Sequence, residues 1–578
     1  MFDLQGLIAA TYKPVFVGFI AYLFFLGFLY FVRRKKHFYF YLVLASSLLP
    51  LFSLLRTGVH QSGDFAINIV KSVDLWVSLS HGIFPAHWAS LLNATYGYPL
   101  FLFTYPLPYY SIVFLKFLGF SFISSEKIMI SVVFILSGIG MYLLTRTFLK
   151  PAQSSLASVL YLFAPYHLVD MHFRVALGEL FAYAFLPYVF YFILQLRSKY
   201  TPTFHLLLSL SFFGLILSHQ AITLVSTPFI FLLPLLLKTR FKTNLYIYSA
   251  LLISILLSSF YWLPLVTSIQ YTHQVDYAKS IGFENPLLYL FSPWRYSFLY
   301  QGPIGQISFP MGFAQLSLVV FSLFLLVKKK IKKTEKKLLI TLLLVLAFMS
   351  IMLLPIAEPL WKLLPFMTNF QFAYRLMLPI SFVLALIGGL GASYIYDKRV
   401  IGIITLAAIL ITILNWGTRT VIPDITDSYL IKRTPLATYE GEGLQPASPR
   451  WRDSQNIWVE KLPASNIEIL TGKAKIVSTK RTPILHAYSI FAEERTLFRE
   501  NTFYFPGWNL YVNGEKCPFS YQDKEKTNTI RFFLPPGKHQ VSLKFENTRV
   551  ITFANSVSLI TFASFLLILT YFSIHKRK

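Results

Sequence analysis

The chain has 578 residues, of which 55% are hydrophobic and 13% charged, and its formal net charge is +27. This composition excludes a soluble globular protein and a single compact domain, and it indicates a lipid bilayer as the solvent. The basic residues do not indicate a nucleic-acid partner, because many of them occur in short runs between apolar segments. The single cysteine, Cys517, excludes an intramolecular disulfide and a cysteine-based metal cage.

Four of these basic runs set the expected orientation of the chain. They occupy residues 33–36, 238–242, 328–337 and 575–578. Positively charged loops stay on the cytoplasmic side of a membrane, so we expect all four runs there. The protein is then a multi-pass cell-membrane protein whose N-terminus is extracytoplasmic and whose C-terminus is cytoplasmic.

Apolar stretches of about 17 to 25 residues are long enough to cross a bilayer as helices, and the chain holds about thirteen of them. In chain order the predicted spans are residues 14–32, 38–55, 128–149, 154–169, 180–196, 204–217, 222–237, 245–266, 314–327, 338–354, 376–396, 400–416 and 550–574. Two long loops, from 56 to 124 and from 267 to 311, are expected outside.

Residues 108–123 are apolar enough to suggest a further span. Counting them as one would place Arg146 and Lys150 outside and reverse the next loop. We therefore interpret this stretch as an interfacial or re-entrant helix.

Residues 417–549 have the composition of an ordinary soluble domain. Short segments there alternate apolar and polar residues, and Asn513-Gly514 and Pro536-Gly537 supply turns between them. The predicted fold is a polytopic α-helical membrane domain (1–416), an extracytoplasmic all-β, sandwich-like domain (417–549), and a final helix with a basic tail (550–578).

Charged residues at the outer boundary of a membrane are costly to hold there, so a role in function is their first interpretation. The first candidate cluster runs from His60 to Asp64, and an amphipathic interfacial helix is expected to follow it. Its polar face is formed by Asp64, Asn68, Lys71, Asp74 or Leu75, and Ser78. Asp64 is equally suited to capping that helix, and the two roles are compatible.

A second cluster contains His167, Asp170 and Arg174, whose spacing predicts one face of a helix, followed by Glu179. The alternative is a structural ion pair between Asp170 and Arg174.

His219 and Arg375 form the third and fourth candidates. His219 interrupts a long apolar run, and either a site role or an interfacial role is open. Arg375 precedes a span, where its guanidinium could grip a lipid phosphate or reach to headgroups. The chain lacks a phosphate-binding glycine loop, an HExxH helix and Cys-His metal spacing, so an ATP-driven transporter is unsupported.

These motifs carry three resemblances. Asp64 in the first outside loop, followed by the Tyr-Pro-rich stretch 98–110, resembles the membrane glycosyltransferases of the C-type fold. Residues 164–179 are similar to the bacterial membrane-protein family labelled 6-pyruvoyl-tetrahydropterin synthase-related. Residues 504–514 and 534–539 resemble the outer domain of YfhO-like membrane proteins, which are regarded as glycosyltransferase-like.

The resemblances imply transfer of a sugar from a polyprenyl-phosphate donor to a glycan, lipid or protein acceptor at the outer face. Asp64 would be the general base. Arg174, Arg375 and His219 would stabilise the departing lipid phosphate. The remaining expected substrate-binding residues are His60, His167, Asp170 and Glu179.

The sequence departs from the simplest C-type pattern, because Asp64 has no acidic neighbour. A divalent metal ion is therefore compatible with this interpretation but not required by it, and no cofactor is assigned. The alternative function is non-catalytic binding or translocation of a lipid-linked saccharide for cell-envelope polysaccharide assembly. A mere anchor for the β-domain is disfavoured, because about a dozen spans exceed what anchoring needs.

Overall fold

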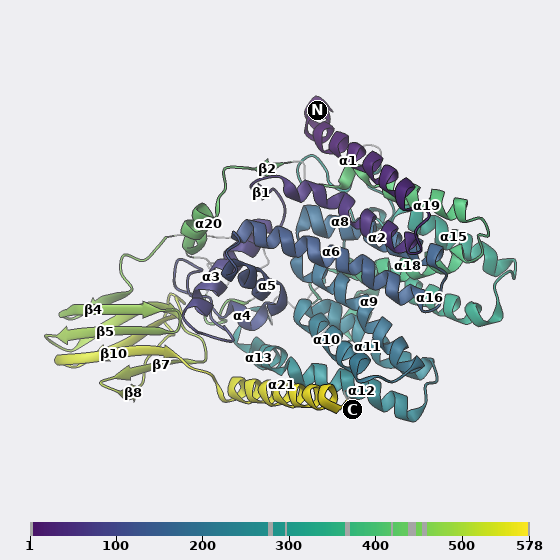
Figure 1. Ribbon diagram of the computed structural model, residues 1–578. Coiled ribbons are helices and arrows are strands. Elements are labelled where there is room, and N and C mark those ends of the chain that lie inside the picture. The colour runs from purple at the N-terminus through teal and green to yellow at the C-terminus, as the bar shows by residue number, and fades with distance from the viewer. Residues whose placement is uncertain are drawn as a thin grey trace. The chain divides into compact units, whose positions relative to one another are not determined.

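The structure is a computed structural model that describes residues 4–274, 281–294, 297–363, 370–417, 420–436, 447–452, 459 and 461–575, with side chains from Val15 to Leu567. The chain divides into two compact units. The first contains Met1–Ala66, Ile123–Ser254 and Ser280–Thr426, and the second contains Ile67–Phe122, Ile255–Lys279 and Asp427–Lys578. Figure 1 shows the helices and strands with their labels.

The first unit is helical. Its main helices are α1 (Leu4–Val32), α2 (Phe38–Leu48), α6 (Phe122–Arg146), α7 (Pro151–Leu162), α8 (Pro165–Val169), α9 (Leu177–Ser198), α10 (Pro202–Ser218), α11 (Gln220–Leu236), α12 (Phe241–Leu257), α15 (Phe313–Val327), α16 (Lys333–Met352), α17 (Glu358–Lys362), α18 (Met377–Ala392) and α19 (Lys398–Leu410). Proline begins α7, α8 and α10, where its fixed φ suits the first turn and its missing N–H is not needed.

Helix α18 forms the centre of this unit, since 94% of the segment Ala373–Ala392 is buried. The glycines of α18 allow neighbouring helices to pack closely against it. A Cβ added at Gly388 would lie 2.5 Å from Leu160 of α7, and one added at Gly389 would lie 2.9 Å from Ala157 of the same helix. Small residues let helix backbones approach closely inside a membrane, so α7 packs directly on α18.

Among the described residues, seven helices are long and apolar enough to cross a membrane, or up to nine if each of two bent helix pairs is one span. Three shorter apolar helices, α10, α11 and α15, accompany them. The prediction of many apolar helices with a β-sheet domain is confirmed, whereas the number thirteen stays a prediction. The expected span 154–169 is divided, because α7 ends at Leu162 and α8 begins at Pro165.

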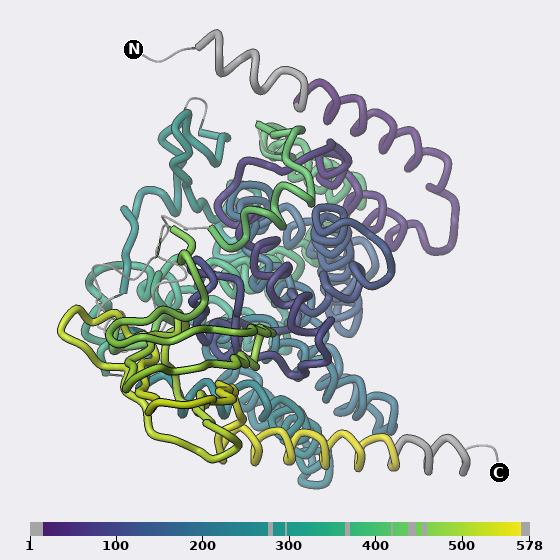
Figure 2. The backbone as a smooth tube through the Cα atoms, turned by 90° about the vertical axis from the view of Figure 1, so that its left-hand side faces the viewer, coloured from purple at the N-terminus to yellow at the C-terminus, as the bar shows by residue number. Residues whose placement is uncertain are grey.

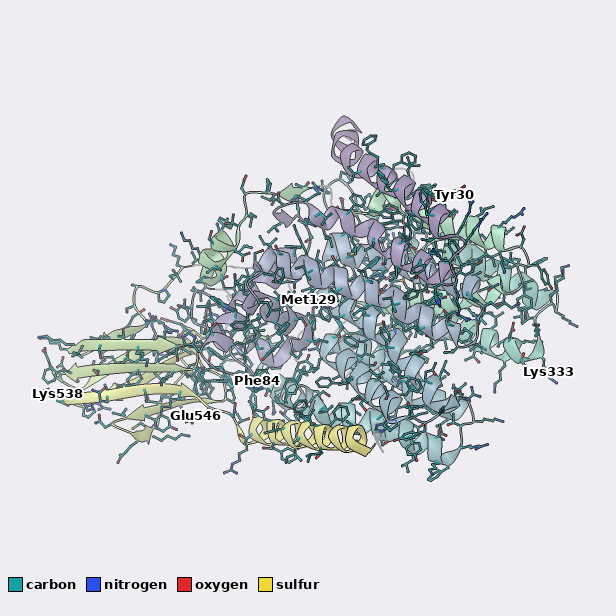
Figure 3. All side chains as sticks on the ribbon, in the orientation of Figure 1. Tyr30, Phe84, Met129, Lys333, Lys538 and Glu546 are labelled. Carbon is teal, nitrogen blue, oxygen red and sulfur yellow. The ribbon has the colours of Figure 1, made fainter. Side chains whose placement is uncertain are left out.

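The basic loops of the first unit can be located in Figure 3. Tyr30, near the end of α1, and Lys333, where α16 begins, both lie toward the right-hand end of the unit in this view. Lys333 belongs to the basic run 328–337, and Tyr30 lies just before the run 33–36. That these runs share one side of a membrane stays a prediction.

The second unit contains short helices and a β-sheet domain. Its helices are α3 (Phe65–Ser80), α4 (Leu100–Phe103), α5 (Pro106–Phe117), α13 (Ser259–Ser268), α20 (Asp427–Arg433) and α21 (Arg549–His575). Helix α5 has 12 residues. At 1.5 Å per residue it spans roughly 18 Å, less than the roughly 30 Å of a bilayer core, as the interfacial interpretation of this stretch requires.

The polar face predicted for α3 is only partly exposed, since Asp64 and Lys71 are partly exposed whereas Asn68, Asp74 and Ser78 are buried. Asn68 and Asp74 are 2% and 0% exposed. Asp74 accepts hydrogen bonds from the backbone N–H groups of Ser90, Leu91 and Leu92 at 2.9–3.1 Å. The polar positions of α3 therefore hold the following loop in place.

The described strands of this β-sheet domain form two antiparallel sheets, ordered β4-β5-β10-β7-β8 and β3-β6-β9. Their bounds are β3 (Ile467–Thr471), β4 (Ala474–Thr482), β5 (Leu485–Ala492), β6 (Thr496–Phe503), β7 (Trp508–Val512), β8 (Glu515–Cys517), β9 (Thr529–Leu534) and β10 (Gly537–Phe545). Alternate residues of β5 and β6 are buried in a shared apolar core that includes Phe498, Trp508 and Leu543. Helix α21, drawn in yellow in Figure 2, follows the last strand, β10, in the chain.

An ion cluster lies inside the β-sheet domain, and we call it the Glu500 cluster (Arg481, His486, Tyr488 and Glu500). Oε1 of Glu500 lies 2.8 Å from Nδ1 of His486, accepts a hydrogen bond from the Tyr488 hydroxyl at 2.9 Å, and lies 3.9 Å from Arg481. Burial alone would raise the pKa of Glu500, but His486 and Arg481 outweigh it and lower that pKa to about 2. The carboxylate is therefore ionised at neutral pH.

Candidate functional site

The site is built on an irregular turn between α8 and α9. Residues Asp170–Arg174 form a π-helical turn, and Val175 follows in the left-handed region with φ of 55°. A β-branched residue rarely adopts that conformation, and both π turns and strained residues are concentrated at functional sites. The expectation that His167, Asp170 and Arg174 share one face of a regular helix is wrong, because the π turn changes the helical repeat.

Four charged side chains converge at this turn, and we call them the Arg174 cluster (Asp170, Arg174, Glu179 and Arg375). Arg174 donates to Asp170 at 2.5 Å and to Glu179 at 3.0 Å. Nε of Arg375 lies 3.7 Å from Oε1 of Glu179. Asp170 and Glu179 are almost fully buried, so their charges need these partners.

Further contacts fix the two guanidinium groups. Arg174 also donates to the Tyr166 hydroxyl at 2.8 Å, and that hydroxyl donates to Glu179 at 2.6 Å. Arg375 donates to the Phe370 carbonyl at 2.7 Å and to the Gln371 side chain at 2.9 Å. Both cations are thus held in one orientation before any ligand binds.

His219 joins the same cluster from the break between α10 and α11. It is 5% exposed, its Nδ1 accepts from the backbone N–H of Ile222 at 3.4 Å, and it interacts electrostatically with Glu179 and Arg375. Three of the clusters that the sequence places far apart therefore meet around Glu179.

The first cluster reaches this site through its backbone. His60 lies in β1 (Val59–His60), which pairs with β2 (Val421–Ile422). Beyond it, the N–H of Gly63 donates to the carbonyl of Phe173 at 2.9 Å, and the N–H of Asp64 donates to the carbonyl of Arg174 at 2.8 Å. The partly exposed Asp64 thus stands directly beside the π turn, immediately before α3 begins.

Two of the predicted histidines are packed into the protein interior. The ring of His167 stacks on Tyr183 with centroids 3.8 Å apart, and its Nδ1 lies 3.2 Å from the carbonyl of Tyr161. His60 is 2% exposed, and burial lowers its pKa to about 3, with Lys127 and Arg56 acting in the same direction. His60 is therefore uncharged at neutral pH and contributes no positive charge for a phosphate.

Arg174 lines a pocket of about 470 Å³, a size typical of small-molecule sites. The lining residues are Arg174, Glu284, Leu288, Trp294, Gln306, Ile307, Phe309, Phe372 and Tyr374. The ring of Tyr374 stacks on Phe309 at 4.4 Å and on Phe372 at 5.1 Å, and the Arg174 guanidinium lies 5.0 Å from its centroid. The fixed cation thus borders an aromatic wall.

The loop between α13 and α15 supplies much of this pocket, including Glu284, Trp294 and Gln306. Gly282 fastens one end of the loop, where its N–H donates to the carbonyl of Gln371 at 2.7 Å and its carbonyl accepts from Ala373 at 2.9 Å. None of the three pocket residues was predicted from the sequence. The only signal was the position of the loop, outside and between two apolar segments.

No three His, Cys, Asp or Glu side chains come together as ligands for a metal ion in the part of the chain that the structure describes. The cations that the structure places around Glu179 are the guanidinium groups of Arg174 and Arg375.

Comparisons with known proteins identify one curated relative, an uncharacterized protein from Lactococcus lactis subsp. cremoris (strain MG1363). It is 26% identical over 325 residues, which are 53% of this chain and 52% of the relative, so the chain matches about half the length of that relative.

Among solved structures, a cryo-EM structure of the arabinofuranosyltransferase AftD from Mycobacteria is similar with a TM-score of 0.42 and 14% identity. The match covers 66% of this chain and 27% of AftD. A mutant of AftD matches with the same TM-score, 12% identity, and coverage of 64% and 27%. Likeness at this level does not by itself establish a common fold.

The family comparison is more extensive. The model described as "6-pyruvoyl-tetrahydropterin synthase related domain; membrane protein" matches residues 102–418, more than half of the chain. The matched region contains the whole Arg174 cluster and every residue that lines its pocket, whereas Asp64 precedes it. The chain belongs to this family of 6-pyruvoyl-tetrahydropterin synthase-related membrane proteins.

Proposed function

We propose that the protein is a membrane glycosyltransferase that moves a sugar from a polyprenyl-phosphate donor to an acceptor at the outer face of the membrane. One observation carries the proposal: the backbone N–H of Asp64 donates to the carbonyl of Arg174, whose guanidinium lines the pocket. This contact makes the residue with the partly exposed carboxylate a backbone neighbour of the residue that carries the fixed cation, and transfer from a lipid phosphate requires both kinds of group.

Asp64 acts as the general base. Its carboxylate accepts the proton of the acceptor hydroxyl while the hydroxyl oxygen bonds to the anomeric carbon of the sugar. The bond between that carbon and the phosphate oxygen breaks, and its electron pair leaves with the polyprenyl phosphate.

Arg174 and Arg375 stabilise the negative charge that develops on the leaving phosphate. Their contacts with Asp170 and Glu179 hold both guanidinium groups in place, so little reorganisation is needed when the charge appears. The two carboxylates also balance the two cations, which keeps the buried cluster stable without a ligand. His219 adds a polar group at the same point.

The partners of this reaction are membrane lipid, the polyprenyl-phosphate sugar, and a glycan, lipid or protein acceptor. The orientation proposed for the chain follows its basic loops, with the N-terminus and the β-sheet domain extracytoplasmic and the C-terminus cytoplasmic.

The test is transfer from a panel of polyprenyl-phosphate sugars by the purified protein in nanodiscs, with and without divalent ions. We expect Asp64→Asn to lower transfer at least about a hundredfold without weakening donor binding, because a general base contributes on that order. Donor binding without transfer by the wild-type protein, over a broad acceptor pool, would instead favour a carrier of lipid-linked saccharide.

A further inference from the structure

Three groups of the pocket have no part in the mechanism above. Glu284, Trp294 and Gln306 come from the loop between α13 and α15, and they line the same space as Arg174. They are presented to one ligand-sized volume by a loop whose backbone is anchored at several points. Apart from Gly282, these points include the N–H of Tyr300, which donates to the Asn415 side chain at 2.9 Å.

Glu284 differs from the other carboxylates of the site. Asp170 and Glu179 are paired with arginine, whereas Glu284 forms no ion pair or side-chain hydrogen bond with any described residue. It is partly buried, and burial raises its pKa. A carboxylate that is partly shielded from water gains from hydrogen-bond donors on a ligand.

The rest of the lining is aromatic. Trp294 and the stacked rings of Phe309, Tyr374 and Phe372 give the pocket broad apolar faces, and Gln306 offers an amide. A sugar ring has the matching character, because its C–H faces are apolar while its rim carries hydroxyl groups. A prenyl chain would cover the aromatic faces but would leave Glu284 without donors.

We propose that this pocket binds the saccharide unit of the lipid-linked substrate, that the unit is uncharged, and that Glu284 accepts hydrogen bonds from its hydroxyls while Trp294 covers one of its faces. The proposal rests on the function inferred above for the lipid linkage. A uronic acid or another anionic sugar is disfavoured, because its charge would lie near the Glu284 carboxylate.

The experiment compares two probes on the protein in nanodiscs: a short-chain polyprenyl phosphate that carries a neutral hexose or pentose, and the same polyprenyl phosphate without a sugar. We expect Glu284→Gln and Trp294→Ala each to weaken binding of the best sugar-bearing probe about tenfold (~1.4 kcal/mol). Binding of the probe without a sugar should not change, which also shows that each variant is folded.

Matched controls lie on the same unit but are not among the residues that line the pocket. Ile304→Ala removes an exposed apolar side chain of the same loop, and Glu358→Gln neutralises an exposed carboxylate paired with Lys362. Neither should alter binding of either probe. Equal loss of both probes in Glu284→Gln and Trp294→Ala would overturn the proposal in favour of a lipid-chain pocket, and no change with either probe would overturn it outright.

The transfer assay with Asp64→Asn distinguishes a failure of this proposal from a failure of the proposed function. Full transfer by Asp64→Asn would overturn the assignment of the base and leave sugar binding through Glu284 intact. Transfer that depends on Asp64 but not on Glu284 or Trp294 would support the enzyme and reject this pocket as its sugar site.

Discussion

The Arg174 cluster and the Glu500 cluster are two groups of buried charges on very different scaffolds. The Glu500 cluster sits on paired antiparallel strands in the core of the β-sheet domain, where the register of β6 shifts after Glu500. Its Arg481 extends to backbone carbonyls, among them that of Thr95 at 2.7 Å. The Arg174 cluster sits on a π turn followed by a left-handed valine, and it lines a pocket.

This difference shows which observations distinguish a candidate functional site from a group of charges that only stabilises the fold. Paired buried charges are common to both clusters, so pairing alone identifies neither. A strained left-handed valine together with ligand-sized space distinguishes the Arg174 cluster, because such strain is concentrated at functional sites. The Glu500 cluster should therefore govern stability, and the Arg174 cluster should govern activity.

The largest effect is expected for Glu500→Gln. The change removes the carboxylate that the buried His486 and the partly exposed Arg481 share, which should destabilise the β-sheet domain by about 3 kcal/mol. Hydrogen exchange of β5 and β6 in the full-length protein measures this, and transfer per folded molecule should be unchanged. Glu468→Gln is the control, because its pair with Arg499 is partly exposed and worth less than about 1 kcal/mol. Equal amide protection in the two variants would contradict the stabilising role of Glu500.

Acid should weaken the same domain by a smaller amount. The folded-state pKa of Glu500 is about 2, below the ordinary value of 4.5, so the folded domain favours the ionised carboxylate. The resulting stabilisation is complete above the unfolded pKa and is lost as the pH falls toward the folded pKa. Between pH 7 and pH 3 the loss should be about 2 kcal/mol.

Hydrogen exchange of the full-length protein over this pH range, corrected for intrinsic exchange rates, tests the acid effect. In Glu500→Gln the loss of domain stability over this pH range should be smaller by the same amount. An unchanged dependence in that variant would assign the acid sensitivity to other carboxylates.

Arg174→Lys should lower transfer about tenfold, equivalent to ~1.4 kcal/mol. An ammonium group cannot reproduce the fork that reaches Asp170, Glu179 and the Tyr166 hydroxyl together. Steady-state transfer and donor binding in nanodiscs measure the loss. Arg499→Lys, in the partly exposed pair of the β-sheet domain, should leave transfer unchanged, and an equal effect of the two variants would remove the distinction between the clusters.

Much of the fold could be predicted because its signals are local. Apolar length indicated the helices, and alternation with Asn513-Gly514 and Pro536-Gly537 turns indicated the strands. Periodicity also predicted one polar face on α3, but it does not report whether water or the backbone of Ser90 to Leu92 meets that face.

The candidate site was predicted only in part. Arg174, Glu179 and Arg375 carried a signal, since charges at the end of apolar segments are unusual. Glu284 and Trp294 carried none, because a carboxylate or an indole in a long loop is ordinary until the fold of that loop is known. The assignment of His167 to substrate binding rested on helical spacing, and the structure packs its ring against Tyr183 instead.

The sequence by itself determined that the chain is a membrane protein with many apolar helices, that a β-sheet domain precedes the last helix, and that it resembles the family to which it belongs. Only the tertiary structure decided that Asp64, Arg174, His219 and Arg375 lie around one turn beside a pocket. The physical reason is that hydrophobic periodicity and turn chemistry act over a few residues, whereas this convergence depends on how helices distant in sequence pack together.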